Sequence, residues 1–270
     1  MPRKATMPFA QSSKSALTDS SSPLPEHATI SLSTRAISAL GILLALALLV
    51  WNLLRLTRSG VLWSWWTPFA GALGFLAADF TSGLIHWAAD TWGRESMPII
   101  GRRLLHPFRV HHVNPDDFLR RNFIDTNGDV ALLGIPLLTL ALPLSDAGQG
   151  WGIAAVFVTA FCGMGLFTNQ FHQWAHRPEP PFLVRRLQDC GLILGREAHG
   201  RHHAYPFVES YCITTGWCNR WLGAVDFFRR LERVVHSVTG WVPRKDETHF
   251  HFKLSNRPRA EGRDAGGDNA

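Results

Sequence analysis

The sequence predicts an all-α integral membrane protein with about four transmembrane helices and a cytoplasmic-side helical cap that carries a histidine-rich metal site. Two observations support this fold class. Four apolar windows divide a chain of 270 residues, of which 46% are hydrophobic. Most of the 13 histidines cluster near the ends of these windows. The net charge of +6 fits this topology and attraction to anionic lipid, and no sequence feature indicates a nucleic-acid partner.

The apolar windows are long enough to cross a bilayer, whose hydrocarbon core requires about 20 residues of helix. They are residues 36–54, 65–89, 130–144 and 151–171. Only Asp79 and His86 interrupt the second window, whereas the third is short and contains Pro136 and Pro143. The sequence therefore predicts four spans, or three spans and a re-entrant hairpin.

Arginines are concentrated in the segment between the second and third windows and in the segment after the fourth. The segment between the third and fourth windows, residues 145–150 (SDAGQG), has no Lys or Arg. By the positive-inside rule, the arginine-rich segments and both termini are cytoplasmic, although Arg55 and Arg58 then fall on the opposite side. The histidine clusters emerge on the cytoplasmic face. The Arg-, Ala- and Trp-rich composition favours a bacterial inner membrane, and a eukaryotic source would imply the endoplasmic reticulum.

The chain is predicted to have three parts. Residues 1–30 are rich in Ser, Ala, Pro and Thr without aliphatic periodicity, which predicts disorder. Residues 31–240 form the membrane domain, and residues 241–270 form a polar tail in which His249 and His251 are expected to be exposed to solvent.

Local signals outside the windows predict further elements. Residues 123–129 (FIDTNGD) predict a turn with a cap before the third span, because Asn-Gly is a turn signal. Residues 183–189 (LVRRLQD) mix Arg with apolar residues and predict an interfacial helix. Residues 190–203 predict a second helix. Residues 211–222 are apolar but too short to span, so they are expected to pack at the interface, to roof the site or to line an acyl-chain tunnel.

The histidines occur in patterns that suit metal binding. Residues four apart share one face of a helix, as His172 and His176 do, whereas His111 and His112 are adjacent and cannot. If both of these bind, they reach different metals or one orients the other. Clustered neutral imidazoles suit a transition metal. Four ligands complete one structural zinc site, so about twice that number predicts two ions. The candidates are His86, Asp90, His111, His112, His172, His176, His199, His202 and His203, with Asn169 as a possible oxygen ligand.

Asp79 is an ionisable residue deep in the second window. It lies on the same helical stripe as Gly83, His86 and Asp90. Because a carboxylate at membrane depth is costly, it is a functional candidate. A hydrogen bond to a neighbouring helix is an equally good explanation.

Long strings of the sequence resemble the plasmanylethanolamine desaturase family, the Kua-type lipid desaturases, which are membrane-bound histidine-rich di-iron enzymes. The likeness covers approximately residues 60–240. The matching strings are ADFTSGLIHWAADTWG (78–93), PFRVHHVNP (107–115), NFIDTNGD (122–129), TNQFHQWAH (168–176), LQDCGLILGREAHGRHH (187–203) and YCITTGWCN (211–219).

This resemblance implies a dioxygen-dependent enzyme with two iron ions. It would introduce the vinyl-ether double bond at carbons one and two of the sn-1 alkyl chain of an ether phospholipid, converting plasmanylethanolamine to plasmenylethanolamine, a plasmalogen. An external electron donor, a small cytochrome or ferredoxin, would dock on the basic cytoplasmic surface. The implied catalytic metal ligands are His86, His111, His112, His172, His176, His199, His202 and His203, with Asp90 and Asn169 as further candidates. His106 is not required by the family pattern, and Ala198 stands where some members have another histidine.

Two other functions are compatible with these residues. An acyl-lipid desaturase or a hydroxylase of the same di-iron class would use the same ligand set, because the product depends on where the chain lies relative to the metal. A membrane metal sensor or transporter is the third hypothesis. Transport predicts ionisable residues through the depth of several spans, and here only Asp79 is deep.

Overall fold

The computed structural model describes residues 24–204 and 206–244, and over this part of the chain the regular structure is helical throughout. Four helices are long and apolar enough to cross a membrane, which confirms the prediction of four spans. They are α1 (Leu32–Arg58), α2 (Thr67–Thr91), α5 (Phe123–Leu144) and α6 (Gln149–His176). The short elements are η1 (Val61–Trp63), η2 (Gly101–Leu105), α3 (His106–Val113), α4 (Pro115–Leu119), α7 (Phe182–Asp189), α8 (Arg196–His202), α9 (Trp217–Ala224) and α10 (Phe227–Thr239).

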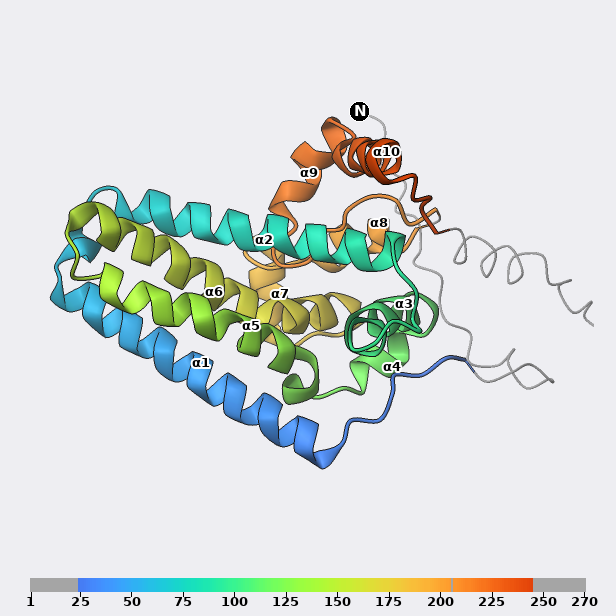
Figure 1. Cartoon of the computed structure of the whole chain (residues 1–270), viewed down its shortest axis with the longest axis horizontal. Coiled ribbons are helices and arrows are strands. Elements are labelled where there is room, and N and C mark those ends of the chain that lie inside the picture. The colour runs from blue at the N-terminus through green and yellow to red at the C-terminus, as the bar shows by residue number, and fades with distance from the viewer. Residues whose placement is uncertain (1–23, 205, 245–270) are drawn as a thin grey trace, which may run out of the picture.

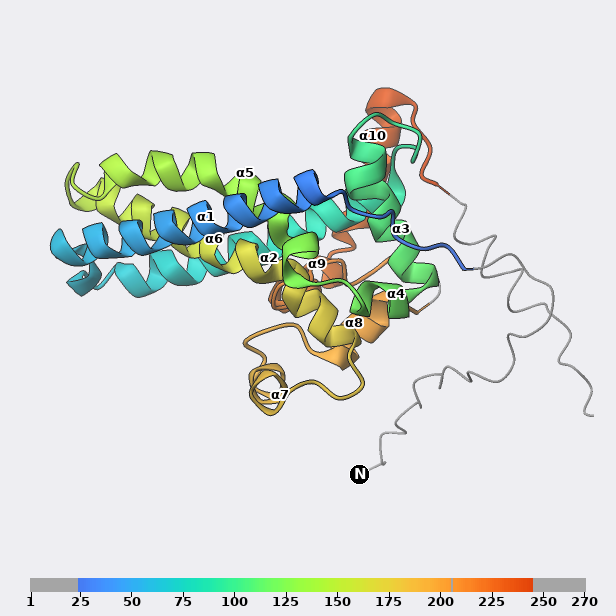
Figure 2. The same ribbon diagram turned by 90° about the horizontal axis from the view of Figure 1, so that it is seen from below.

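The four long helices lie side by side, and the short elements other than η1 gather toward one end of this bundle (Figures 1 and 2). Helices α1 and α5 begin at that end, whereas α2 and α6 finish there. Helix α1 packs on α5, α2 packs on α6, and α5 packs on α6. Residues such as Ile42, Leu138 and Leu166 fill the centre. Leu43 and Leu133 point outward and are 63% and 72% exposed, as expected for side chains that face lipid.

Helix α5 begins earlier than the sequence pattern indicated. The predicted turn at residues 123–129 is wrong, because this segment forms the first turns of α5. The Asn122 side chain caps the helix by accepting a hydrogen bond from the Asp125 N–H at 2.9 Å. Gly128 lies inside the helix because α1 passes close to it: a Cβ at this position would stand 2.3 Å from the Cβ of Ser38. The Asn-Gly pair therefore marks a close helix contact.

The segment after α6 contains one helix as predicted and one that is shorter than predicted. Residues 183–189 are helical within α7, as their pattern indicated. The predicted helix over residues 190–203 is wrong in its first half, where only Arg196–His202 form α8. Gly191 adopts a positive φ of 67°, which ends α7, and the Leu194 N–H donates to the Thr214 carbonyl instead of continuing a helix.

The described residues that precede α1 form an extended segment over α3 and α4, which we call the N-terminal strap (residues 24–30). Its Pro25 carbonyl accepts from the Asn114 side chain at 3.1 Å. The His27 N–H and Nδ1 both contact the Asp117 carboxylate, at 2.7 and 2.6 Å. Most of the segment predicted to be disordered, residues 1–30, lies outside the described residues, as do most of the predicted polar tail and its two histidines.

Candidate metal centre

Nine of the ten candidate ligands meet in two adjoining groups where α2 and α6 finish. The five-histidine group contains His111, His172, His176, His199 and His203. The Asp90 group contains His86, Asp90, His112 and His202. Within each group, the candidate donor atoms all lie within 4.8 Å of one another. The groups touch, since the rings of His112 and His203 are 4.9 Å apart.

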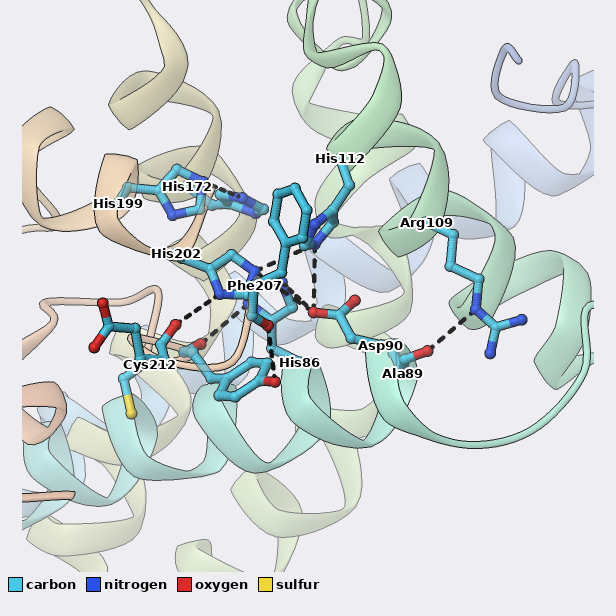
Figure 3. A network of polar contacts seen from close by, with 12 residues as sticks. His86, Ala89, Asp90, Arg109, His112, His172, His199, His202, Phe207 and Cys212 are labelled. Atoms are coloured by element: carbon cyan, nitrogen blue, oxygen red, sulfur yellow. Dashed lines mark hydrogen bonds and ion pairs between the residues drawn. The ribbon is translucent and has the colours of Figure 1, made fainter. Parts of the chain in front are cut away.

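The last turns of α2 supply His86 and Asp90, which are four residues apart and face the same side. The His86 Nε2 and Asp90 Oδ2 atoms are 3.2 Å apart, and both side chains are buried. Arg109 fixes this end of α2 by donating to the carbonyls of Ala89 and Trp92 at 3.3 and 2.7 Å. Because Arg109 belongs to α3, it also sets the position of α3 relative to α2 (Figure 3). Sequence reasoning did not identify this role.

Helix α3 supplies His111 and His112, and their adjacency sends them in different directions. His111 joins the five-histidine group, and His112 joins the Asp90 group. The His112 Nε2 atom lies 3.3 Å from Asp90 Oδ2 and 3.2 Å from His202 Nε2. One short helix thus contributes to both groups.

Helices α6 and α8 complete the five-histidine group. The Nε2 atoms of His172, His176 and His199 form a triangle with sides of 2.8 to 3.3 Å. His203 follows one turn after His199, and its ring is 4.7 Å from that of His176. His202 lies between His199 and His203 in the sequence, but its side chain points to the Asp90 group, as Figure 3 shows.

Two backbone carbonyls orient imidazoles of the Asp90 group. The His86 Nδ1 atom lies 3.1 Å from the Tyr211 carbonyl oxygen, and the His202 Nδ1 atom lies 2.9 Å from the Glu209 carbonyl oxygen. A carbonyl can only accept, so each Nδ1 carries the proton and each Nε2 presents a lone pair. This is the tautomer that an Nε2 metal ligand requires.

The spacing of the donor atoms and the buried donor atoms without a hydrogen-bond partner both suit bound metal ions. Two ligands that bind one ion at about 2.1 Å stand about 3.0 to 3.4 Å apart in right-angled or tetrahedral arrangements. Two sides of the Nε2 triangle, 3.0 and 3.3 Å, fall within that range, and the third, 2.8 Å, is slightly shorter. Further buried atoms, which include His111 Nε2, His203 Nε2 and both Asp90 carboxylate oxygens, have no hydrogen-bond partner among the described residues. Buried polar atoms are rarely left so, and here a cation in each group would satisfy them.

Burial keeps four histidines of the ligand groups, all of them outside the spans, neutral. Burial, together with the neighbouring imidazoles, lowers the pKa values of His111, His199 and His203 well below 6.5. Burial also lowers the pKa of His202, even though Asp90 acts in the opposite direction. These imidazoles are therefore uncharged at pH 7, which is the form that binds a metal.

Aromatic side chains cover both groups. The Phe118 ring lies 5.0 Å from that of His172 and 5.9 Å from that of His111. The Phe207 ring lies 5.4 Å from that of His112, and Tyr211 lies 5.0 Å from His202. The site is thereby shielded from water. None of these rings was singled out from the sequence, since aromatic residues are frequent throughout the chain.

Asp79 holds a loop against α2 at membrane depth. Its Oδ1 atom accepts hydrogen bonds from the backbone N–H groups of Thr214, Thr215 and Gly216 at 3.2, 2.8 and 2.9 Å. Its Oδ2 atom accepts from the Cys218 N–H at 2.9 Å. The same loop carries the Tyr211 carbonyl that orients His86. The structure thus supports the hydrogen-bonding explanation, with a loop and the start of α9 as the partner instead of a spanning helix.

Asn169 and His106 have partners outside the two ligand groups. The Asn169 side chain donates to the Thr126 carbonyl and so joins α6 to α5, and its role as a ligand stays a prediction. His106, which was left out of the ligand set, contacts Glu95 at 2.8 Å and the Glu26 carbonyl at 3.1 Å. Among the described residues, His106 belongs to neither group.

Fold and site together define a class: a membrane-spanning helical bundle that ends in two largely buried groups of side chains that could hold metal ions. Comparisons with known proteins identify the family. The chain matches the Lipid desaturase domain over residues 75–246. It is 44% identical to a plasmanylethanolamine desaturase of Myxococcus xanthus over 191 residues, which cover 68% of each chain. It is 41% identical to plasmanylethanolamine desaturase 1 of Mus musculus over 67% of this chain and 69% of that one.

Plant relatives are more distant. The chain is 36% identical to the chloroplastic fatty acid desaturase 4 of Arabidopsis thaliana over 71% of this chain and 54% of that one. No solved structure matches the chain significantly. The chain belongs to the lipid desaturase family, as the resemblance of its motifs indicated. It is an oxidoreductase that desaturates a membrane lipid.

Proposed function

We propose that this protein introduces the vinyl-ether double bond between carbons one and two of the sn-1 alkyl chain of an ether phospholipid, converting plasmanylethanolamine to plasmenylethanolamine. The observation that carries the proposal is the pair of adjoining ligand groups at the C-terminal ends of the spanning helices α2 and α6. The names of the relatives from Myxococcus xanthus and Mus musculus support the choice of lipid.

Each ligand group would hold one iron ion. His111, His172, His176, His199 and His203 would hold the first ion. His86, Asp90, His112 and His202 would hold the second, with Asn169 as a further candidate ligand. With dioxygen as co-substrate, the bound irons would supply the oxidising power needed to remove hydrogen from an unactivated C–H bond.

The protein's own residues prepare the site for this chemistry. The Tyr211 and Glu209 carbonyls hold two imidazoles in the required tautomer. Phe118 and Phe207 exclude water, which protects a reactive site from side reactions. Because the ligands lie at the end of the spans, a lipid that stays in the bilayer can bring the first carbons of its chain to them.

The overall reaction requires electrons from outside the protein. The two carbons lose two hydrogen atoms, and two further electrons and two protons complete the reduction of dioxygen to two waters. We propose that a small cytochrome or ferredoxin supplies these electrons at the basic surface. Replacing both Arg185 and Arg186 by Glu should slow reduction of the protein by its electron donor without loss of iron. The same replacement of Arg58, on the opposite side of the membrane, should not slow this reduction. Unchanged reduction kinetics in the double variant would argue against this docking surface.

We also propose that the ligand groups face the cytoplasm, in a bacterial inner membrane or, in a eukaryote, the endoplasmic reticulum. The arginine-rich segments lie on the side of the ligands, whereas the opposite side carries residues 145–150, without Lys or Arg. Labelling of single cysteines introduced near Gln149 and near Arg201 in intact cells would test this orientation.

Acyl-lipid desaturation is the second candidate, and one finding favours it. Relatives named fatty acid desaturase, such as that of Arabidopsis thaliana, match this chain over a similar length. A hydroxylase of the same class would share the ligands. The metal sensor or transporter is a weaker hypothesis, because Asp79 is engaged by four backbone N–H groups.

Lipid analysis decides between these functions. The protein would be expressed in cells without plasmalogens that are supplied with an alkylglycerol, and the lipids would be examined by mass spectrometry before and after acid. Acid-labile vinyl ethers should appear with the native protein and with His106→Ala, and should be absent with His111→Ala. A new double bond only in acyl chains would refute the ether-lipid proposal and support the second candidate.

A further inference from the structure

Helices α9 and α10 extend away from the bundle beside α2, and we call residues 217–242 the C-terminal arm. Figure 1 shows α9 leaving α2 partway along its length and α10 near the end of α2. One face of the arm is buried, because Phe228 packs on Trp87 and Tyr211. Other positions of the arm carry large apolar side chains that are exposed.

These exposed apolar side chains fall in two rows. Residues four apart share one face of a helix. The rows are Trp217, Trp221 and Val225, on and directly after α9, and Val234 and Val238 on α10. Trp221 is 72% exposed and Val238 is 79% exposed. Exposed apolar rows of this kind mark a surface that binds a membrane or a partner.

The contacts of the arm with α2 set its level relative to the bilayer. At the start of α9, the Cys218 N–H donates to Asp79 at 2.9 Å, and Asp79 lies about 18 Å before Thr91, the last residue of α2. On α10, Glu232 accepts from the Trp87 indole N–H at 3.3 Å, about one turn before that end. The arm therefore runs from the depth of Asp79 to the end of the span, the layer in which hydrocarbon gives way to headgroups.

The charges of the arm favour an anionic partner. Its four arginines outnumber its two carboxylates. Glu232 accepts from Arg229 at 2.9 Å, and Asp226 lies 3.8 Å from Arg233. The other two arginines are Arg220 and Arg230. Both are exposed, and neither forms an ion pair within residues 24–204 and 206–244.

We propose that the C-terminal arm lies in the headgroup layer of an anionic leaflet, with its apolar rows at the edge of the hydrocarbon and Arg220 and Arg230 against lipid phosphates. Tryptophan is enriched at this level of a bilayer, and a helix with an apolar face flanked by arginines lies in the interface plane. Lipid explains the rows better than a protein partner does, because α9 starts at the depth of Asp79, where lipid surrounds the bundle. The proposal does not depend on which lipid is desaturated.

Fluorescence quenching of the full-length protein in lipid nanodiscs tests the level of the arm. A bimane label would be attached to Val225→Cys or to Val234→Cys, in a Cys190→Ser background that removes the exposed native cysteine. The background protein alone gives the signal of the other thiols. Both labels should be quenched by lipids brominated near the headgroup end of their chains and protected from aqueous iodide. Leu133→Cys, which faces lipid within α5, and Arg201→Cys, outside the spans, give the two reference values.

Two results of this measurement would overturn the proposal. Iodide quenching at either position as strong as in Arg201→Cys would place the arm in water. Protection from iodide without quenching by brominated lipid would show that protein, such as a second copy of this chain, covers the arm.

The label on Val234→Cys also tests the charge of the lipid. Nanodiscs of phosphatidylcholine would contain the same small fraction of either brominated phosphatidylglycerol or brominated phosphatidylcholine. Phosphatidylglycerol should quench the label more strongly, because it gathers beside the arginines of the arm. Arg230→Gln should lower this enrichment about fivefold, the effect of one basic residue near an anionic membrane surface. Arg58→Gln, at the opposite end of the bundle, is the matched control and should leave the enrichment unchanged.

Equal quenching by the two brominated lipids, or an unchanged enrichment in Arg230→Gln, would overturn the proposal of an anionic leaflet. None of these measurements requires turnover, so they are independent of the ether-lipid function.

Discussion

Replacing Asp79 by Asn tests whether a carboxylate at membrane depth holds the loop that orients His86. Asn has the same shape as Asp, but an NH2 group replaces one of the two carboxylate oxygens. The remaining oxygen can still accept from the N–H groups of Thr214, Thr215 and Gly216. The NH2 group would face the Cys218 N–H, and because both groups are donors, no hydrogen bond can form between them.

The loss of stability can be worked out from these four hydrogen bonds. Leaving the Cys218 N–H buried and unpaired costs roughly 1 to 3 kcal/mol. The other three bonds change from charge-assisted to neutral, which removes about 1 kcal/mol from each. The sum is about 4 to 6 kcal/mol, an appreciable part of the roughly 5 to 15 kcal/mol that stabilises a typical protein. Asp79→Asn should therefore fold but unfold at a lower temperature, whereas Asp79→Ala should not accumulate.

Thermal unfolding in detergent and metal analysis would measure the two consequences. Because the Tyr211 carbonyl is displaced with the loop, the Asp90 group should lose its metal before the five-histidine group does. Asp146→Asn, at the opposite end of the bundle, is the matched control and should leave both quantities unchanged. An Asp79→Asn protein with native stability and full metal content would show that the carboxylate does not hold the loop.

Three further predictions concern Gly83, His27 and the removal of metal. Gly83→Ala should destabilise the fold by about 1 to 3 kcal/mol, because the added Cβ would stand 2.4 Å from the Cys212 Sγ atom. Gly71→Ala, on the same helix, is the control, since a Cβ there meets nothing within 4 Å. Equal unfolding temperatures for the two variants would refute this prediction. Burial lowers the pKa of His27 below 6.5, and the hydrogen bonds from His27 lower that of Asp117 despite the opposing effect of burial. As the pH falls, the unfolded chain therefore takes up protons at a higher pH than the folded chain does. The free energy of unfolding should fall as the pH drops from 7 to 5, and His27→Gln should flatten this dependence. Removal of metal by a chelator should lower the unfolding temperature of the native protein, and a chelator without effect would contradict the assignment of buried metal ligands.

The spans and the meeting of the histidines could be predicted because both leave short-range signals. Hydropathy identifies a helix that faces lipid, and a spacing of four places His172 and His176 on one face. The adjacency of His111 and His112 indicated correctly that they point in different directions. These inferences need only the geometry of a single helix.

The supporting parts of the site could not be predicted, because they depend on contacts between distant segments. The carbonyl that orients His86 comes from Tyr211, 125 positions along the chain. Arg109 looked like one basic residue among many until its contacts with the end of α2 were seen. The start of α5 was missed because Asn-Gly usually marks a turn, and the close approach of Ser38 that requires Gly128 is invisible in the local sequence.

The attachment of the loop to Asp79 has a consequence for biosynthesis. The carboxylate enters the membrane within α2, which has the lowest mean hydropathy of the four spans, 1.3. Its last hydrogen-bond donor, the Cys218 N–H, is synthesised 139 residues later. Until then the helix carries an unmatched charge, which at the centre of a span costs about 3 kcal/mol on insertion scales. Nascent chains that stop before Cys218 should therefore hold α2 in the bilayer less firmly than the finished protein does.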